Sequence, residues 1–286
     1  MNVERSIEIP LERIRARVEA GERLCREDGL FLMGTDVPLH AVGQLANGMR
    51  ERINGNLAYY NINEHLNPTN VCANRCAFCV FRADPDDAKA YVMNDEQVLA
   101  RGHEAMESGC TELHIVGGLH PHKGYDWYVR IVRLLHDAFP ALHLKAWTAI
   151  EIGWLERLAR KPARAVLEDL IEAGVGSLPG GGAEIFHPDV RRRICEHKAD
   201  AETWLRIHRT AHELGLRTTC TMLYGHLEND EHRIDHLVKL RDLQDETEGF
   251  QTFVPLAFHR QNTSLGQIPQ ASALTERRVM AVSLLM

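Results

Sequence analysis

Three cysteines close together in the sequence are the residues best suited to chemistry. Cys72, Cys76 and Cys79 are spaced C-x3-C-x2-C and are three of only seven cysteines in the 286-residue chain. Thiolates this close in one loop can all bind one soft metal centre. Structural zinc sites and iron–sulfur clusters normally have four ligands from the protein. Three cysteines would leave one iron of a four-iron cluster free to bind a substrate.

Two alternatives remain open for this cysteine cluster. The three residues could be unrelated buried thiols, or a zinc knuckle completed by His65 or another histidine. No second pair of cysteines accompanies them, since Cys25, Cys110, Cys195 and Cys220 are isolated. We expect these four to be small buried hydrophobic residues. The spacing of the other three favours a metal centre.

Glycines and polar side chains follow the strands that the sequence predicts, where a barrel binds its ligands. Gly117 and Gly118 follow the second strand, and paired glycines either let the backbone approach a ligand or form a tight turn. Glu184 follows three glycines after the fourth strand and is either a ligand contact or a carboxylate at a helix N-terminus. Other polar residues at strand ends are Thr148, Glu151, Tyr224, His226, Glu228, His259, Arg260 and Asn262.

Short strands alternate with helical segments from residue 57 onward, which predicts a parallel sheet with right-handed crossovers. The predicted strands are 57–62, 112–116, 142–148, 175–178, 217–223 and 250–257. Helical periodicity and helix-ending residues predict helices between them. Asn94 and Gln97 form a capping pattern for the first of these helices. We expect the basic run from Arg191 to Arg193 to lie on a solvated surface.

The first part of the chain has a different pattern. Apolar residues recur at helical spacing in residues 1–55, which predicts an N-terminal helical cap, and residues 56–286 form the barrel. A closed barrel has eight strands, but only six are legible. The chain stops within an amphipathic segment, so we expect the C-terminal part of the barrel to be missing from it.

Composition narrows the class of protein. The formal net charge is −7, which argues against a general nucleic-acid or membrane-surface role. No apolar stretch is long enough to cross a membrane, and the charged N-terminus lacks the apolar segment of a secretory signal. We therefore expect a cytoplasmic α/β protein.

Several segments resemble those of a known superfamily. The cysteine spacing, with Phe78 before the last cysteine, is similar to the motif of the radical S-adenosylmethionine (radical SAM) enzymes. From about Leu24 to Met286 the chain resembles the aminofutalosine synthase family of the futalosine route to menaquinone. The matching segments are NINEHLNPTNVCANRCAFCVF, HIVGGLHP, LKAWTAIEI, SLPGGGAEIF, TTCTMLYGHLE and LRDLQDETEGFQTFVPLAFH.

Sister families share part of this pattern. The dehypoxanthine futalosine cyclases and the radical enzymes of deazaflavin (F420) assembly have the same cysteine motif and the PGGGAEI and YGH segments. The segments HIVGGLHP and FVPLAFHRQNT favour the synthase. We keep the cyclase and the deazaflavin enzymes as alternatives, and a non-catalytic zinc protein as a more distant one.

The resemblance implies a TIM-like (β/α) barrel that holds a [4Fe–4S] cluster on Cys72, Cys76 and Cys79, with SAM on the fourth iron. It also implies functional residues at the strand ends. Those expected to bind SAM are Gly117, Gly118, Ser177, Glu184, Tyr224 and His226. Those expected to act in catalysis are Glu184, His120 and Arg82.

The implied reaction adds the 5′-deoxyadenosyl radical from SAM to 3-[(1-carboxyvinyl)oxy]benzoate and gives 6-amino-6-deoxyfutalosine. This substrate carries two carboxylates, so its site needs cationic or amide donors. Arg82, His120, His259 and Arg260 are the candidates. The expected partners are this aromatic dicarboxylate and an electron donor, either a reductase or a flavodoxin or ferredoxin, with no nucleic acid and no membrane.

Overall fold

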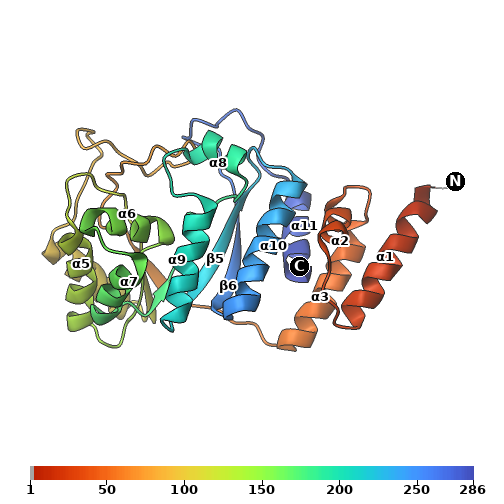
Figure 1. The fold of residues 1–286 in the computed structure, drawn as a ribbon, viewed down its shortest axis with the longest axis horizontal. Helices are drawn as coiled ribbons and strands as arrows, with labels where there is room; N and C mark the ends of the chain where they lie inside the picture. The colour runs from red at the N-terminus through yellow and green to blue at the C-terminus, as the bar shows by residue number, and fades with distance from the viewer. Residues whose placement is uncertain (1–2) are drawn as a thin grey trace.

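Six parallel strands form one curved sheet in the computed structural model, which describes residues 3–286 (Figure 1). The strands pair in chain order, from β1 to β6. They are β1 (Asn63–Leu66), β2 (Glu112–Ile115), β3 (His143–Ala146), β4 (Ser177–Leu178), β5 (Arg217–Tyr224) and β6 (Phe250–Ala257). The predicted parallel α/β sheet of six strands is confirmed, and it forms a half-barrel.

Helices precede the sheet, connect its strands and follow it. Three come first: α1 (Val3–Glu19), α2 (Arg26–Met33) and α3 (Leu39–Asn54). The connecting helices are α4 (Asp95–Glu107), α5 (Tyr125–Ala138), α6 (Ala149–Ala159), α7 (Ala163–Glu172), α8 (Pro188–Cys195), α9 (Ala201–Glu213) and α10 (Asp230–Thr247). The last helix is α11 (Ala273–Leu285). In the described part of the chain, no helix is both long and apolar enough to span a membrane.

The capping pattern predicted for α4 is present. The Asn94 side chain accepts a hydrogen bond from the backbone N–H of Gln97, and the Gln97 side chain accepts one from the backbone N–H of Asn94, both at 2.9 Å. This reciprocal pair satisfies backbone donors that the helix itself leaves free.

Alternation along the strands gives the sheet an apolar face and a polar face. Leu113, Ile115 and Leu144 are buried in a hydrophobic cluster beneath the helices. Between them, His114 pairs in register with Lys145 across β2 and β3. The polar residues therefore lie on the concave face of the half-barrel.

Two hydrophobic cores hold the fold. The first core lies between the sheet and α4–α7 and α9, with Trp147 and Trp204 as its largest fully buried side chains. The second core contains residues of the N-terminal helices together with residues of β5, α8, α10 and α11. The N-terminal helices predicted within residues 1–55 are confirmed, and they share this second core with the barrel. The domain boundary at residue 55 stays a prediction.

The predicted strand at 57–62 is wrong, because this segment is extended coil and the first strand begins at Asn63. Leu57, Tyr59 and Tyr60 have the side chains of a strand, but they are exposed. Register with β2 starts only where Asn63 pairs with Glu112. The other five predicted strands are confirmed, with boundaries shifted by up to two residues.

Candidate metal and cofactor site

The three clustered cysteines line one cavity at the carboxyl ends of the strands. Cys72, Cys76 and Cys79 lie in the long loop between β1 and α4, and all three are free thiols. They line a cavity of about 530 Å³. The sequence prediction that these residues lie together is therefore supported by the fold.

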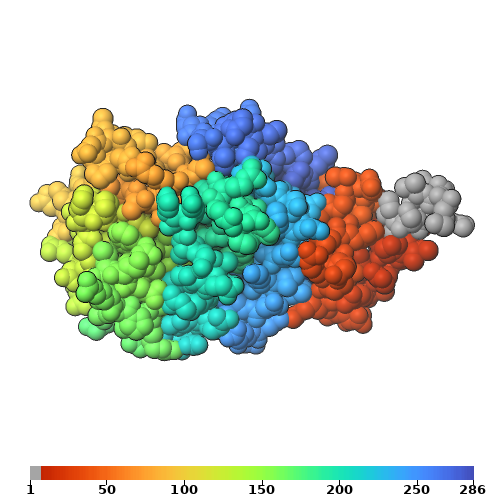
Figure 2. All heavy atoms as spheres, turned by 45° about the horizontal axis from the view of Figure 1, so that its top comes forward, coloured from red at the N-terminus to blue at the C-terminus, as the bar shows by residue number. Residues whose placement is uncertain are grey.

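The cysteine loop is fixed by backbone hydrogen bonds to distant segments. Ala73 donates its N–H to the carbonyl of Leu119 at 2.9 Å, and Ala77 donates its N–H to the carbonyl of Ile194 at 2.8 Å. The carbonyl of Ala77 accepts from the backbone N–H of Ser264 at 3.1 Å. Figure 2 shows the orange cysteine segment and the blue segment after β6 on the same face of the molecule.

The cysteines contact both cores. Cys72 packs against the first core, whereas Cys76 and its neighbours Ala77 and Phe78 pack against the second. The Sγ of Cys72 accepts a hydrogen bond from the backbone N–H of Leu119 at 3.4 Å. Hydrogen bonds to cysteine sulfur atoms tune the reduction potential of an iron–sulfur cluster that those sulfurs bind.

The donor set fits a multi-iron cluster better than a single ion. No group of three or more His, Cys, Asp or Glu side chains in residues 3–286 converges on one ion position. His65 lines the same cavity as the three cysteines. Burial raises the pKa of Cys72, and it raises that of Cys76 to about 12. Both are thus neutral unless bound iron displaces their protons.

Gly117 and Gly118 also line the cavity, and they meet different neighbours. A Cβ on Gly118 would lie 2.1 Å from the carbonyl oxygen of Val71, whereas one on Gly117 would have no atom closer than 3.5 Å. The second glycine is therefore needed because the turn after β2 packs against the cysteine loop. The first is free of that constraint.

Glu151 joins this turn to the start of α6. Its Oε1 accepts the backbone N–H of Gly117 at 3.0 Å, and its Oε2 accepts the backbone N–H of Thr148 at 3.0 Å. Burial raises the pKa of Glu151, although these hydrogen bonds oppose the shift. The capping box of α6 thus forms part of the cavity wall.

Lys198 is a cavity residue that the sequence analysis missed. Its Nζ lies 2.5 Å from Oε1 of Glu184 and 5.3 Å from the ring centre of Phe78. Burial is the largest single influence and acts to lower the pKa of Lys198, but the charge and hydrogen bond of Glu184, together with Cys76 and Cys195, outweigh it and the pKa is raised. The ammonium group is therefore charged, close to Cys76 in a largely buried wall. Nothing in the local sequence marks Lys198, because the fold alone brings it to the cysteines.

Two non-glycine residues near the cavity have left-handed backbone conformations. Trp147, after β3, has a φ of 61°, and Glu184, after β4, has a φ of 48°. Such conformations cost energy in residues with large side chains and are concentrated at functional sites. Trp147 directly precedes Thr148, which lines the cavity.

Of the three residues predicted to be catalytic, only Arg82 lines the cavity. It forms an ion pair with Asp84, and its buried Nε has no hydrogen-bond partner in the described part of the chain. Glu184 does not itself line the cavity, but its carboxylate forms an ion pair with Lys198, which does. His120 is buried beside it, where its backbone N–H donates to the hydroxyl of Tyr128 at 3.0 Å.

Tyr224 and His226 lie at the end of β5, outside the residues that line the cavity. The Nδ1 of His226 accepts the backbone N–H of Leu227 at 2.7 Å, and its Nε2 bonds the carbonyl of Leu223 at 3.0 Å. Tyr224 is buried in the second core. Their role in SAM binding stays a prediction.

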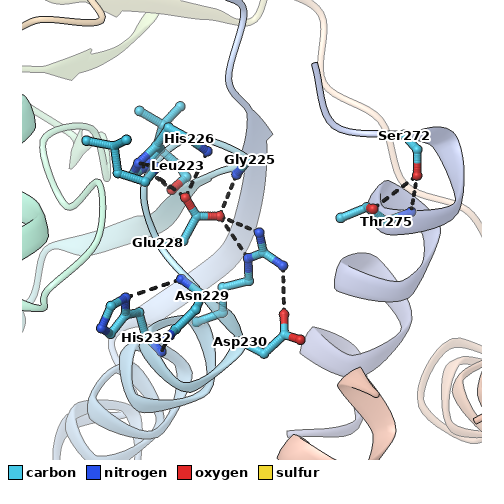
Figure 3. Close-up of polar contacts among 11 residues, drawn as sticks. Leu223, Gly225, His226, Glu228, Asn229, Asp230, His232, Ser272 and Thr275 are labelled. Carbon is cyan, nitrogen blue, oxygen red and sulfur yellow. Dashed lines mark hydrogen bonds and ion pairs between the residues drawn. The ribbon is translucent and has the colours of Figure 1, made fainter. Parts of the chain in front are cut away.

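Glu228 completes the turn after β5 as the centre of a buried network (Figure 3). It accepts the backbone N–H groups of Gly225 at 2.5 Å and His226 at 2.8 Å. It also forms an ion pair with Arg233 of α10 at 2.5 Å. The polar residues of this turn thus satisfy one another.

Ser177, also predicted to bind SAM, is buried on the concave face. Its hydroxyl lies 2.7 Å from Nε2 of His143, and it does not line the cysteine cavity. His259 and Arg260 are exposed in the loop after β6. Their predicted contact with substrate is untested.

The prediction that Arg191 is solvated is wrong. Its guanidinium is buried and donates to backbone carbonyls, among them Ala183 at 2.5 Å and Gly182 at 3.3 Å. Five donors in one planar group let arginine satisfy a strained loop. Arg191 therefore holds the glycine-rich loop that carries Glu184.

Comparison with known proteins identifies the superfamily. Residues 66–240 match the radical SAM superfamily. The chain is 45% identical over 268 residues to the aminodeoxyfutalosine synthase of Streptomyces coelicolor, covering 94% of this chain and 69% of that protein. It is 41% identical over 248 residues to the 5-amino-6-(D-ribitylamino)uracil–L-tyrosine 4-hydroxyphenyl transferase of Methanopyrus kandleri, covering 85% and 67%.

Solved structures support the fold. The FeFe-hydrogenase maturase HydG from Carboxydothermus hydrogenoformans superposes with a TM-score of 0.75 at 18% sequence identity. The match covers 99% of this chain and 65% of that one. A [4Fe–4S] cluster and SAM are the cofactors of the superfamily, and the thiols and cavity described above suit them. The chain belongs to the radical SAM superfamily, and within it the chain is similar to aminodeoxyfutalosine synthases and tyrosine 4-hydroxyphenyl transferases.

Proposed function

We propose that this protein is an aminofutalosine synthase, which joins the 5′-deoxyadenosyl group of SAM to 3-[(1-carboxyvinyl)oxy]benzoate in menaquinone biosynthesis. The observation that carries the proposal is the single cavity lined by three free cysteines, the Gly117–Gly118 turn and a buried lysine. The identity of 45% to a synthase across most of the chain supports this substrate.

In this proposal Cys72, Cys76 and Cys79 hold the cluster, and SAM binds beside them. When bound and reduced, the cluster would supply the one electron that cleaves SAM into methionine and the 5′-deoxyadenosyl group that adds to the substrate. The chain's own residues bind and orient the reactants. The backbone at Gly117 approaches SAM closely because it has no side chain.

Lys198 supplies a fixed positive charge for the carboxylate of SAM. It lies in the cavity wall, and its partner Glu184 holds it in place. Charge-assisted hydrogen bonds are stronger than neutral ones, and they gain further where water is excluded. Arg82 offers its unpaired Nε to a carboxylate of the substrate. Phe78 and Ile150 keep water from the same cavity.

Product mass tests the proposal. Protein reconstituted with iron and sulfide under anaerobic conditions is incubated with dithionite, the enol-ether substrate and SAM labelled with ¹³C at the 5′ carbon. A synthase places the label in 6-amino-6-deoxyfutalosine. Protein treated identically without dithionite is the control, because it lacks the electron that starts the reaction.

Two other activities would give different products. A cyclase, given dehypoxanthine futalosine, would abstract a hydrogen atom from it, release the label of SAM as free 5′-deoxyadenosine and leave the enol ether unchanged. The 41% identity to a tyrosine 4-hydroxyphenyl transferase gives a second candidate, which would consume tyrosine and the diaminouracil. Turnover of either of these substrates, with none of the enol ether, would overturn our assignment.

A further inference from the structure

A row of polar side chains on the concave face of the sheet has no role in the cluster site. The strand register aligns His65 of β1 with His114 of β2, and His114 with Lys145 of β3. Their sequence neighbours Leu66, Leu113 and Leu144 are buried in the first core. The polar side chains therefore project into the half-barrel, where the sheet is not covered by its helices.

The two histidine rings of this row form a flat surface. The rings of His65 and His114 are stacked, with centroids 4.7 Å apart and planes inclined by 24°. Neither ring makes a hydrogen bond within residues 3–286. Burial lowers the pKa of His114 to about 4, so this ring is uncharged at neutral pH. A neutral imidazole such as that of His114 retains one N–H donor.

The row also contains a balanced pair of charges. Lys145 Nζ lies 2.7 Å from Oε2 of Glu112, and both side chains are almost buried. Burial is the largest single influence and acts to raise the pKa of Glu112, but the hydrogen bond and charge of Lys145, with smaller effects from Asn63 and His143, together outweigh it and the pKa is lowered. Glu112 is thus ionised and neutralised by its partner. A bound anion would therefore face the N–H donors of the imidazoles and the ammonium group of Lys145. The positive charge of Lys145 is balanced by Glu112.

The row is continuous with the cysteine cavity, because His65 lines that cavity together with the three cysteines. A ligand with one end beside the cluster can therefore extend along His65 onto the concave face. Aromatic rings favour stacking on flat neighbours, and carboxylates favour N–H donors. The proposed substrate has an enol ether at one end and an aryl carboxylate at the other.

We infer that His65, His114 and Lys145 form the subsite for the aryl carboxylate of an aromatic substrate, whose ring lies against the row. This inference rests on the proposed function. It also gives the subsite a part in specificity, because a phenol without a carboxylate would leave these donors unpaired. The enol ether then faces the cysteines, and the aryl carboxylate lies away from them.

Equilibrium binding to the reconstituted, unreduced protein tests the subsite without turnover. The two probes are 3-[(1-carboxyvinyl)oxy]benzoate and 2-phenoxyacrylate, which lacks only the aryl carboxylate. We expect the wild type to bind the dicarboxylate about tenfold or more tightly than 2-phenoxyacrylate. His114→Phe keeps a flat ring but removes the N–H, so the ratio of the two Kd values should fall toward one.

A second variant covers the case in which His114→Phe does not fold. Lys145→Met combined with Glu112→Gln removes both charges and keeps the approximate shapes, and it should lower the same ratio. His40→Phe, on the exposed surface of α3, is the matched control and should leave it unchanged. Circular dichroism and the visible absorption of the cluster show whether each variant is intact.

The outcomes separate the inference from the proposed function. If wild-type protein forms 6-amino-6-deoxyfutalosine but intact variants keep the full Kd ratio, the subsite is wrong and the function stands. If the wild type neither turns over the enol ether nor distinguishes the two probes, both are wrong. A ratio that falls in both row variants, and not in His40→Phe, supports the subsite.

Discussion

Lys198 and Glu184 form a buried ion pair with 2.5 Å between Nζ and Oε1, in the wall of the cavity that contains the cysteines. Glu184 follows β4 in a left-handed conformation, and Lys198 follows α8. The pair therefore links the glycine-rich loop to the segment beside Cys76. It brings a fixed cation to the cavity in which we propose that SAM binds.

Removal of this pair should weaken SAM binding and leave the cluster in place. Lys198→Met alone would leave Glu184 buried without a cation, which is strongly destabilising. The double variant Glu184→Gln/Lys198→Met avoids this cost. We expect its Kd for SAM to rise about tenfold or more, because a charge-assisted contact is lost. Equilibrium binding measures the change. Unaltered SAM affinity would show that Lys198 serves only the fold.

Substitution of any clustered cysteine should abolish the cluster. Cys72→Ser, Cys76→Ser and Cys79→Ser should each give protein with little iron and no brown colour after anaerobic reconstitution, since three thiolates are the full protein ligand set. Cys110→Ser, in the first core, is the matched control and should bind iron as the wild type does. Iron and sulfide analysis with visible spectroscopy measures the result. A colourless wild type with one bound zinc would contradict the cluster.

The paired glycines should differ in their tolerance of alanine. Gly118→Ala places a Cβ 2.1 Å from the carbonyl oxygen of Val71, so the cysteine loop must move. We expect a loss of about 1–3 kcal/mol in the free energy of unfolding, together with weaker iron retention. Gly117→Ala makes only ordinary contacts and should stay close to wild-type stability. Denaturant titration compares the two. Equal losses would contradict the packing explanation for Gly118.

Acid should destabilise the protein partly through His236. This ring is fully buried, where it bonds the carbonyl of Thr221 at 2.9 Å and accepts the N–H of Phe186 at 3.2 Å. Burial, with smaller effects from Arg191 and Lys239, lowers its pKa to about 3. Between pH 6.5 and about 3 the unfolded chain therefore binds a proton that the folded chain does not.

The free energy of unfolding therefore decreases as the pH falls, because protons that bind only the unfolded state favour unfolding. Stability is fully present above pH 6.5 and falls as the pH decreases. At pH 5 the loss from His236 is about 2 kcal/mol relative to pH 8. His236→Gln should show a shallower decrease in unfolding free energy over this range. Parallel pH profiles for the variant and the wild type would contradict this origin.

The cysteine site could be predicted because its signals are local. Cys72, Cys76 and Cys79 fall within eight residues, and Gly117 with Gly118 lies just after a strand. The expectation that polar residues after a strand contact the ligand is less successful for Tyr224 and His226. Their turn uses its polar groups internally, through Glu228, and no sequence pattern shows that in advance.

Lys198 and the concave row could not be predicted because both depend on tertiary structure. Lys198 lies more than 100 residues from the cysteines, and only the packing of α8 against their loop brings it near. The row of His65, His114 and Lys145 depends on the register of three short strands, which sequence leaves undetermined. The strand wrongly predicted at 57–62 shows the same limit, since the strand propensity of these residues does not provide a neighbouring strand with which they can pair.

The two hydrophobic cores meet at the cysteine loop, with Cys72 on the first and Cys76 on the second. A cluster bound by both residues would act as an inorganic cross-link between two halves of the molecule. Oxidative loss of iron would then remove this connection and leave the two cores joined by the continuous sheet. The visible absorption of the protein would then report whether the two cores are still joined at this loop, as well as the redox state of the cluster. On heating, we expect the visible absorption to decrease before the helical circular dichroism signal does.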